Sequence, residues 1–281
     1  MPAGGRKALS LASKPVVVAP ADMTVRELVG IMVENETRRV PVVSADNRVV
    51  GIVISRTILD YIGGGPKANI WMLEMGRDLA RGLNAVQIQR IMSTHVISLP
   101  STATVLEAVK ILLRTGVGGV PLLKGGRAEG MISERDLLSL LTKKTGIPVE
   151  YHMSRHLITA DPTTSFLHLC KLVVSMDLRR LPVVLEGRLV GIITSMDLLR
   201  ALNLDSVQRL ILAGQADDVF RMEIKNFMTR KVITIDHDAD LQEAAQLMVR
   251  EEITGLPVLR EGKLEGIITA HDLLRWLIYH I

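Results

Sequence analysis

The sequence is poor in aromatic residues and has a single cysteine, and each shortage narrows what the protein can be. Phe, Trp and Tyr make up 3% of the 281 residues, so the core must be built from Val, Ile, Leu and Met. One cysteine, Cys170, excludes a disulfide within the chain and favours a cytoplasmic protein. Few aromatic rings also means few platforms for stacking nucleobases, which argues against a nucleic-acid-binding protein.

Long apolar runs and a strong charge imbalance are missing as well. No stretch reaches about 18 uninterrupted apolar residues, so we expect no transmembrane helix and no membrane partner. The first residues, MPAGGRKALSLASKPVVV, lack the apolar core of a secretory signal. The net charge of +4 permits anionic ligands without demanding them, and a hydrophobic content of 48% is typical of a globular protein.

Signatures of catalysis and of metal binding are also missing. The seven histidines are scattered, and none forms an HExxH or a similar spaced metal pair. We find no glycine-rich phosphate loop and no nucleophile elbow. Cys170 falls inside a predicted helix, where a core position is expected. The sequence therefore predicts a protein that is not an enzyme and has neither a metal site nor a catalytic cofactor.

What the sequence does contain is a fourfold repeat. The segment GIITAHDLL at 266–274 has relatives in GIITSMDLL at 191–199, GMISERDLL at 130–138 and GIVISRTIL at 51–59. A proline between apolar residues precedes each segment. These prolines are Pro41, Pro121, Pro182 and Pro257. Proline and glycine are ten residues apart in the first copy and nine apart in the others. Ordered copies at matching spacing indicate a repeat architecture.

Each copy predicts a β-α-β-β-α unit. The first strands are expected at 16–18, 96–98, 157–159 and 232–234. The helices that follow begin at the capping residues Thr24, Thr104, Ser165 and Asp240. A capping box with an acid three residues later is expected at Glu27, Glu107 and Glu243, with His168 replacing the acid in the third copy. The hairpin turns are Glu186-Gly187 and Glu261-Gly262, where glycine supplies a positive φ.

The predicted organisation is an α/β fold of the α+β type with four repeats at 10–65, 88–143, 149–203 and 224–281. Helical inserts are expected at roughly 65–90 and 203–225, after copies one and three. Only a short linker, 143–148, joins copies two and three. A single unit is too small to bury both of its helices well. We therefore predict two tandem pairs, copy one with two and copy three with four.

The pattern resembles the CBS domain, the repeat named after cystathionine β-synthase. The resemblance rests on the dipeptides Met92-Ser93, Met153-Ser154 and Met228-Thr229, which precede the first strands of copies two to four and which we call leads. It also rests on the prolines between apolar residues and on the Gly-x-x-Ser/Thr-x-x-Asp ends. The resemblance covers nearly the whole chain. A chain of four such copies is similar to the gamma subunit of AMP-activated protein kinase. The resemblance implies tandem modules (Bateman modules), two of which can form a disc, and adenosine-containing ligands in clefts between paired repeats.

The Ser/Thr-x-x-Asp ends have two interpretations. Such a sequence can simply cap a helix, although the acid here is Asp while the first helices of this chain use Glu. Alternatively, a carboxylate suits the two ribose hydroxyls, and a hydroxyl at a helix start suits a phosphate. The resemblance implies these ligand-binding roles for Ser133 and Asp136, Thr194 and Asp197, and Thr269 and Asp272. The first copy has Ile54 and Thr57 instead, so its site is expected to be empty or to support a neighbour's ligand.

The resemblance also implies contacts for the base and the phosphates. The adenine would lie against Ile97, Ser98, Val120 and Pro121, against Ile158, Thr159, Leu181 and Pro182, and against Ile233, Thr234, Leu256 and Pro257. Basic pairs precede the proline in the odd copies, Arg38-Arg39 and Arg179-Arg180, where Arg39 and Arg180 would hold phosphate or, alternatively, face the helix dipole or solvent. The even copies have Gly118-Gly119 and Thr254-Gly255, and a glycine such as Gly255 would let a ligand approach the backbone closely. Further phosphate contacts are expected from Arg56 and Arg135, while His271 would meet phosphate or solvent.

The leading hypothesis is a non-catalytic regulatory sensor of AMP, ADP or ATP that acts on an unidentified protein partner. An S-adenosylmethionine or other adenosyl-ligand sensor is the first alternative, although two arginine pairs favour a phosphate-bearing ligand. A nucleic-acid-binding or scaffold protein is the second, and a steep salt dependence of RNA or DNA affinity would support it. The protein is expected to be a monomer or a homodimer.

Overall fold

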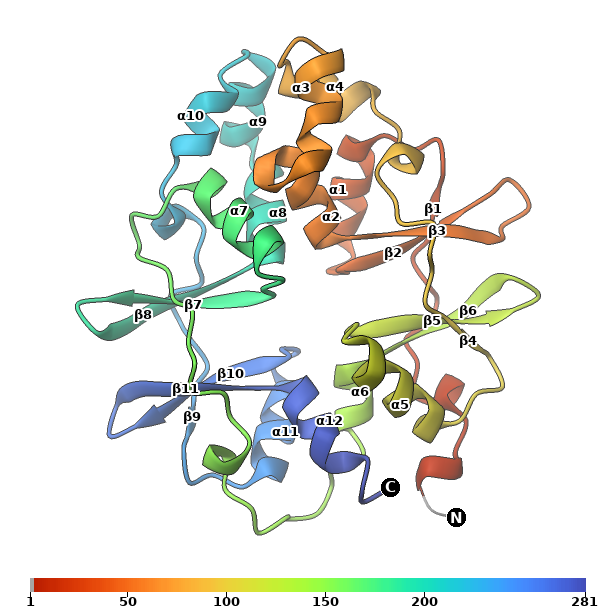
Figure 1. The fold of residues 1–281 in the computed structure, drawn as a ribbon, viewed down its shortest axis with the longest axis vertical. Coiled ribbons are helices and arrows are strands. Elements are labelled where there is room, and N and C mark those ends of the chain that lie inside the picture. Colours follow the sequence, from red (N-terminus) through yellow and green to blue (C-terminus); the bar gives the residue numbers. More distant parts are fainter. Residues whose placement is uncertain (1–2) are drawn as a thin grey trace. The chain divides into compact units, whose positions relative to one another are not determined.

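The computed structural model describes residues 3–281 and contains four copies in the predicted β-α-β-β-α order, with the first strand of copy three reduced to a single bridging residue (Figure 1). Copy one consists of β1 (Ala19–Pro20), α1 (Val25–Glu34), β2 (Arg39–Val43), β3 (Val49–Ile54) and α2 (Ser55–Leu59). Copy two consists of β4 (Leu99–Pro100), α5 (Val105–Thr115), β5 (Gly119–Lys124), β6 (Arg127–Ser133) and α6 (Glu134–Leu138). The two copies therefore follow one plan, as their sequence motifs predict.

Copies three and four repeat this plan. Copy three consists of α7 (Phe166–Ser175), β7 (Arg180–Leu185), β8 (Arg188–Thr194) and α8 (Ser195–Leu202). Copy four consists of β9 (Ile235–Asp236), α11 (Leu241–Arg250), β10 (Gly255–Arg260), β11 (Lys263–Thr269) and α12 (Ala270–Leu277). The inserts are helical as predicted, with α3 (Asn69–Glu74), α4 (Leu79–Ala85), α9 (Asp205–Leu212) and α10 (Ala216–Arg221). A 3₁₀ turn opens each copy, at Ala8–Ser10, Ile88–Arg90, Val149–Tyr151 and Ile224–Asn226.

The first strand of each copy begins later than predicted. The residues that pair in parallel with the hairpin are Ala19–Pro20, Leu99–Pro100 and Ile235–Asp236, and in copy three only Ala160 forms such a bridge, to Val183. The predicted segments 16–18, 96–98, 157–159 and 232–234 are extended but form no ladder. Each of these segments connects two paired regions. The lead before it pairs with the hairpin of the neighbouring copy, and the short strand after it pairs with the hairpin of its own copy.

These leads are exchanged within each tandem pair. Ser93, before copy two, bridges Ile52 of copy one, and Ser13, before copy one, bridges Met131 of copy two. The second pair repeats the exchange. Ser154, before copy three, bridges Ile267 of copy four, and Thr229, before copy four, bridges Ile192 of copy three. Both residues of each bridge belong to one compact unit, so each lead pairs inside a unit with a hairpin of the copy next to its own in the sequence.

A glycine receives each exchanged lead. A Cβ added at Gly191 would lie 2.6 Å from the sulfur of Met228, and one added at Gly266 would lie 2.6 Å from the sulfur of Met153. Gly51 faces Met92 in the same way. The motif glycine faces a lead methionine in copies one, three and four, while Gly130 of copy two faces Leu9 and Ala12.

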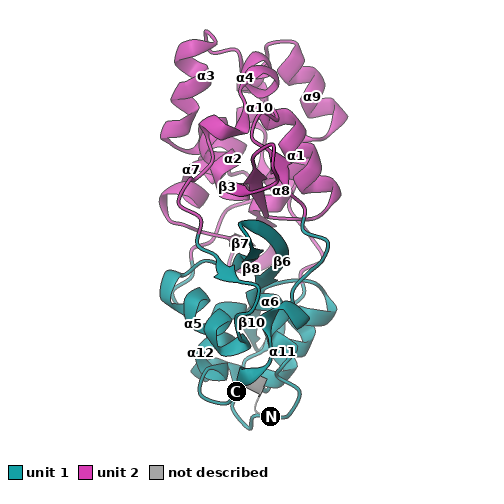
Figure 2. Ribbon diagram, turned by 90° about the vertical axis from the view of Figure 1, so that its right-hand side faces the viewer, with its two compact units in different colours: residues 1–16, 97–157, 233–281 teal, residues 17–96, 158–232 magenta. Residues whose placement is uncertain are grey.

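The chain forms two compact units, each with its own aliphatic core (Figure 2). Unit 1 (1–16, 97–157 and 233–281) contains copies two and four, and unit 2 (17–96 and 158–232) contains copies one and three with the helical inserts. In unit 1 the second helices α6 and α12 pack together, and in unit 2 α2 packs on α8. The described core is mainly aliphatic, as the composition predicts, with Tyr61, Trp71 and Phe166 as large aromatic members.

The hairpin turns differ from the prediction in one residue. Both turn positions have a positive φ, 51° at Glu186 and 77° at Gly187, and the turn at Glu261 and Gly262 repeats this. A two-residue turn that matches the strand twist needs both central residues in this conformation. The glutamates are therefore held in a left-handed conformation that the sequence assigned to the glycines alone.

Asp240 does more than the predicted capping box. Its carboxylate accepts the N–H of Gln242 at 2.7 Å, and it also accepts the N–H groups of Thr145 and Gly146 in the linker, at 3.0 and 2.6 Å. Glu243 closes no capping box here, whereas Glu27 and Glu107 do so as predicted. One carboxylate thus caps α11 and fastens the linker that joins copies two and three.

Asp240 should make the stability of unit 1 depend on acid pH. Burial alone would raise the pKa of Asp240, but hydrogen bonds from Gln242, Thr145 and Gly146 outweigh this effect and lower the pKa. A lowered pKa in the folded state gives stability that is present above the unfolded value of about 4 and is lost as the pH falls. We expect Asp240→Asn to destabilise the protein by about 0.5–2 kcal/mol at pH 7, measured by urea unfolding.

The same variant should lose part of the acid sensitivity. Its free energy of unfolding should fall less than that of the wild type between pH 5 and pH 2, about the window set by the titration of a carboxyl group. Asp238→Asn, at an exposed position two residues earlier, is the matched control. Equal pH dependence in Asp240→Asn and in the wild type would contradict this account.

Candidate functional site

The three Ser/Thr-x-x-Asp ends form capping boxes at the starts of α6, α8 and α12. In each box Oδ2 of the aspartate accepts both the N–H and the hydroxyl of the Ser/Thr. The distances are 2.8 and 2.7 Å from Ser133 to Asp136, 2.7 and 2.7 Å from Thr194 to Asp197, and 2.9 and 2.5 Å from Thr269 to Asp272. The helix-cap interpretation is therefore confirmed. It occupies only one of the two carboxylate oxygens, so it does not exclude a ligand at the other.

The second oxygen, Oδ1, has different surroundings in copies three and four. Oδ1 of Asp197 accepts a hydrogen bond from Nη1 of Arg200 at 2.9 Å. Oδ1 of Asp272 accepts none from residues 3–281. Asp272 is partly exposed, so its second oxygen can accept hydrogen bonds from a ligand.

Cross-strand pairing brings the predicted basic residue beside the predicted hydroxyl. Arg180 lies opposite Thr194 in the β7–β8 ladder, and Arg39 lies opposite Ile54 in the β2–β3 ladder. Side chains of directly opposite residues share one face of the sheet, about 4.5–5.5 Å apart at Cβ. In copy three, a guanidinium, a hydroxyl and a carboxylate are thus grouped at the start of one helix.

Glycine takes the place of arginine in the even copies. Gly119 lies opposite Ser133 and Gly255 lies opposite Thr269. A Cβ added at Gly119 would lie 3.0 Å from the carbonyl oxygen of Ile132 and 3.2 Å from Cβ of Ser133. The strand therefore approaches the capping residue too closely for most side chains, and the close approach of a ligand to these glycines stays a prediction.

The residues predicted to contact adenine fall into two groups. Val120, Pro121, Leu181, Pro182, Leu256 and Pro257 lie in β5, β7 and β10 and are buried. Val120, Leu181 and Leu256 are at most 1% exposed and belong to the unit cores, so a ligand would meet their backbone before their side chains. The extended residues Ile97, Ser98, Ile158, Thr159, Ile233 and Thr234 are more accessible, and their contact with a ligand stays a prediction.

His271 has a partner that the sequence did not indicate. Its Nδ1 lies 2.9 Å from Oε1 of Glu134, the first residue of α6 in the other copy of unit 1. Glu134 is 2% exposed, and a buried carboxylate needs hydrogen-bonding partners. The expectation that His271 meets phosphate or only solvent is therefore wrong for this ring nitrogen. In unit 2 the corresponding helix starts are joined by the hydroxyls of Ser55 and Ser195 at 2.8 Å.

The arginines proposed as additional phosphate contacts also reach the other copy of their unit. Nη1 of Arg135 donates to the carbonyl of Glu252 at 2.7 Å, and Arg56 forms an ion pair with Asp177. Phosphate binding by either residue would have to share or break these contacts. One signal in the sequence indicates these partners, because Asp177 and Glu252 both fall five residues before the proline in their copies.

We call the Ser/Thr hydroxyl and the Asp carboxylate of each Ser/Thr-x-x-Asp end a clamp. Copy one lacks this clamp, as its sequence predicts. Ile54 precedes α2 and makes no side-chain hydrogen bond to the helix start. Thr57 takes the position that an aspartate holds in the other copies. Whether copy one supports a neighbour's ligand stays a prediction.

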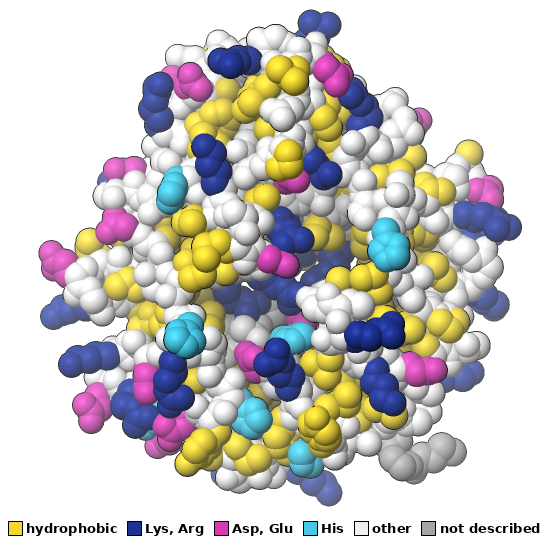
Figure 3. Space-filling view, viewed as in Figure 1, with side chains coloured by type: hydrophobic (Ala, Val, Ile, Leu, Met, Phe, Trp, Pro, Cys, Tyr) yellow, Lys and Arg dark blue, Asp and Glu magenta, His cyan; other side chains and the backbone are white. Residues whose placement is uncertain are grey.

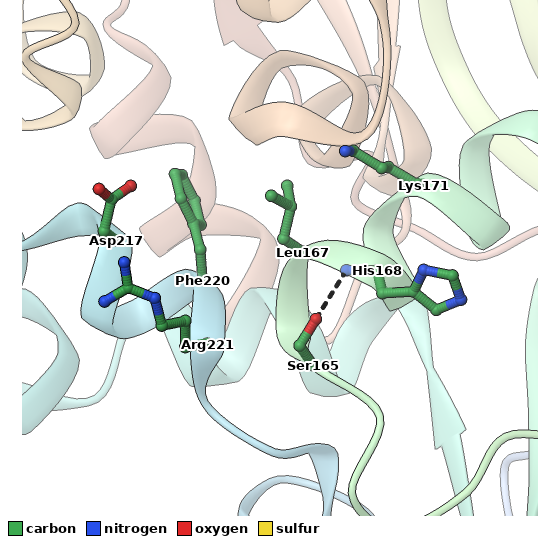
Figure 4. Close-up of a pocket in the computed structure, with 7 residues that line it drawn as sticks. All are labelled: Ser165, Leu167, His168, Lys171, Asp217, Phe220 and Arg221. Atoms are coloured by element: carbon green, nitrogen blue, oxygen red, sulfur yellow. Dashed lines mark hydrogen bonds between the residues drawn. The ribbon is translucent and has the colours of Figure 1, made fainter.

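A surface hollow of about 260 Å³ lies elsewhere in unit 2 (Figure 4). Residues of α7 and its cap line one side and residues of α10 line the other. The lining residues are Ser165, Leu167, His168, Lys171, Asp217, Phe220 and Arg221. None of the predicted ligand-binding residues lines it.

Structural signs of other chemistry are few in the described part of the chain. No group of three or more His, Cys, Asp or Glu among residues 3–281 could hold a metal ion. Burial raises the pKa of the Cys170 thiol, which disfavours the reactive thiolate. No helix within the described residues is long and apolar enough to cross a membrane. On the face shown in Figure 3, Lys and Arg side chains occur among Asp and Glu over most of the surface.

Comparison with known proteins finds one family match for each of the four copies. A family model described as the CBS domain matches residues 8–64, 88–143, 149–204 and 224–279. Protein MJ1225 of Methanocaldococcus jannaschii is 34% identical over 269 residues, covering 94% of this chain and 96% of that protein. Its crystal structure, described as that of a candidate archaeal homologue of g-AMPK, has a TM-score of 0.92 and covers 96% of this chain and 99% of that one.

Two more distant proteins share the four-repeat length. A 33.4 kDa protein of the ribosomal RNA operon of Thermofilum pendens is 24% identical, over 92% of this chain and 87% of that protein. A conserved protein from Pyrococcus horikoshii has a crystal structure with a TM-score of 0.59 at 23% identity, covering 96% of this chain and 98% of that one. The last likeness shows a shared fold.

Proposed function

Because the chain belongs to the CBS domain family, we propose that it is a non-catalytic regulatory protein that binds adenine nucleotides at copies two, three and four. The observation that carries this proposal is the capping aspartate. Three copies fix one carboxylate oxygen with a hydroxyl and an N–H, and in copy four the other oxygen of Asp272 has no partner among residues 3–281. An oriented carboxylate with an open oxygen suits the adjacent hydroxyls of a ribose.

Phosphate recognition is supported by what surrounds the clamp in copy three. Arg180 lies opposite Thr194, at the start of a helix whose N-terminal dipole favours an anion. A guanidinium offers paired donors that match phosphate oxygens. These groups favour a nucleotide over an adenosyl ligand without phosphate.

Binding of a nucleotide at these sites would provide the regulation of the protein partner. A ligand at the start of α8 or α12 touches helices that pack against the other copy of the same unit, through Ser195 in unit 2 and His271 in unit 1. A ligand that binds one arrangement of these helices better than another shifts the population between them. We propose that a protein partner reads this shift, as a regulatory subunit would require.

Isothermal titration calorimetry with AMP, ADP, ATP and S-adenosylmethionine tests the proposal. We expect saturable binding of at least one adenine nucleotide, with no more than three ligands per chain because copy one lacks the clamp. Arg180→Gln should weaken nucleotide binding and leave S-adenosylmethionine unaffected, since only the nucleotide carries phosphate. Absence of binding by all four compounds at about 1 mM, a free energy no better than about −4 kcal/mol, would refute the proposal.

A further inference from the structure

Arg200 connects the ribose clamp of copy three to copy one. It lies on α8, three residues after Asp197, and its Nη1 donates to Oδ1 of Asp197 at 2.9 Å. Its Nη2 donates to Oε1 of Glu36 at 3.2 Å. Glu36 follows α1 of copy one and has a φ of 48°. All three residues belong to unit 2.

Copy four has the same arginine without the same contact. Arg275 lies three residues after Asp272, is exposed, and makes no hydrogen bond or ion pair with residues 3–281. The reason lies in the other copy of unit 1. Counting back five residues from the proline, copy one has Glu36 while copy two has Gly116, which offers no carboxylate. The second anchor that holds Arg200 over its aspartate is thus missing for Arg275.

We infer that Arg200 is a positioning residue that weakens nucleotide binding at copy three by occupying the oxygen of Asp197 that the ribose needs. The inference rests on the proposed function. Oδ2 of Asp197 is already committed to Thr194, so a ribose hydroxyl must share or displace Arg200 at Oδ1. The side chain of Asp197 is only 9% exposed, which leaves little room for sharing.

Displacement is feasible because Arg200 has somewhere to go. Its side chain is 44% exposed, and Glu36 can keep one of its hydrogen bonds when Asp197 is released. Nucleotide binding at copy three therefore moves an arginine from a contact within copy three to a contact with copy one alone. Copy four, whose Asp272 has an open oxygen, binds without this step. The two copies therefore differ in affinity, with copy four the tighter site.

The test isolates one site at a time. In Asp136→Ala/Asp272→Ala, only copy three retains a complete clamp, and AMP affinity is measured by calorimetry with and without Arg200→Ala. We expect Arg200→Ala to raise the affinity about threefold to tenfold, since one charge-assisted hydrogen bond no longer competes. Arg200→Lys should restore much of the competition, because an ammonium group can also reach the carboxylate.

Copy four supplies the matched control. In Asp136→Ala/Asp197→Ala, Arg275→Ala should leave AMP affinity unchanged. Damage to the fold would lower the melting temperature and the affinity together, whereas removal of a competitor raises the affinity. If the double variants do not fold, Arg200→Ala in the wild-type chain should tighten one binding step and leave the others unchanged.

Two results would overturn the inference and are distinguishable. Unchanged or weaker AMP binding in Arg200→Ala, with normal binding in its parent, refutes the role of Arg200 and leaves the proposed function intact. Absence of AMP binding in the wild type and in both parents refutes the proposed function and the inference with it. Glu36→Gln gives an independent check, since a weaker second anchor should hold Arg200 less firmly over Asp197, ease its displacement and raise the affinity about twofold to fivefold.

Discussion

Asp272→Ala is expected to lower the affinity of copy four for AMP by about tenfold to a hundredfold. The carboxylate is oriented by Thr269 through Oδ2, and its Oδ1 has no partner in the described chain, so the ribose would lose the charged acceptor that is open to it. Hydrogen bonds to a charged group are worth more than those between neutral groups, which is why the effect is large. Calorimetry with AMP should show the loss at one binding step only.

The difficulty in this experiment is that Asp272 also caps a helix. Glu107→Ala is the matched control, because Glu107 accepts the N–H and hydroxyl of Thr104 at 2.7 and 2.9 Å in the same geometry at the start of α5. Both variants should lose about 1 kcal/mol of stability. Only Asp272→Ala should lose ligand affinity, and equal affinity in the two variants would leave Asp272 a helix cap alone.

Gly191→Ala is expected to destabilise the protein by about 1–3 kcal/mol. The new Cβ would lie 2.6 Å from Sδ of Met228 and 3.2 Å from the carbonyl oxygen of Thr229, so the exchanged lead has to move. Urea unfolding measures the loss. Met228→Ala removes the nearest obstacle, and the double variant should be more stable than the sum of the single effects predicts.

Gly30→Ala is the opposite control. Gly30 lies inside α1, and a Cβ added there meets nothing within 4 Å. The substitution should therefore stabilise the protein by about 0.5–1 kcal/mol, since alanine favours a helix more than glycine does. If Gly191→Ala and Gly30→Ala had the same sign, the lead would not be packed as described.

The structural features that the sequence predicted correctly are those that depend on residues close to one another in the chain. The capping boxes at Thr24 and Thr104 depend on side chains three residues apart, and so do the clamps at Ser133, Thr194 and Thr269. The order of elements followed from hydrophobic spacing and from the proline and glycine landmarks. These signals are local and are repeated along the chain, so chance agreement is small.

The features that the sequence missed depend on which copies pack together. The partner of His271 is Glu134, 137 residues away, and the partner of Arg200 is Glu36, 164 residues away. Tandem order gives no sign that copy one shares a core with copy three. The first strands were placed too early for a related reason, because hydrogen bonds of the lead to the neighbouring copy delay the start of pairing within its own copy.

Because each lead packs on the hairpin of the neighbouring copy, a fragment with a single copy cannot reproduce this packing. Each copy covers its motif glycine with residues from the copy beside it, and the exchange is mutual in both pairs. A chain of one copy could cover that glycine only by borrowing the lead of a second chain. Each tandem pair is thus equivalent to a swapped homodimer whose two subunits have been fused into one polypeptide. Cutting the chain at the boundary of a single repeat would therefore leave the motif glycine uncovered, and cutting it into tandem pairs would divide the core of each unit.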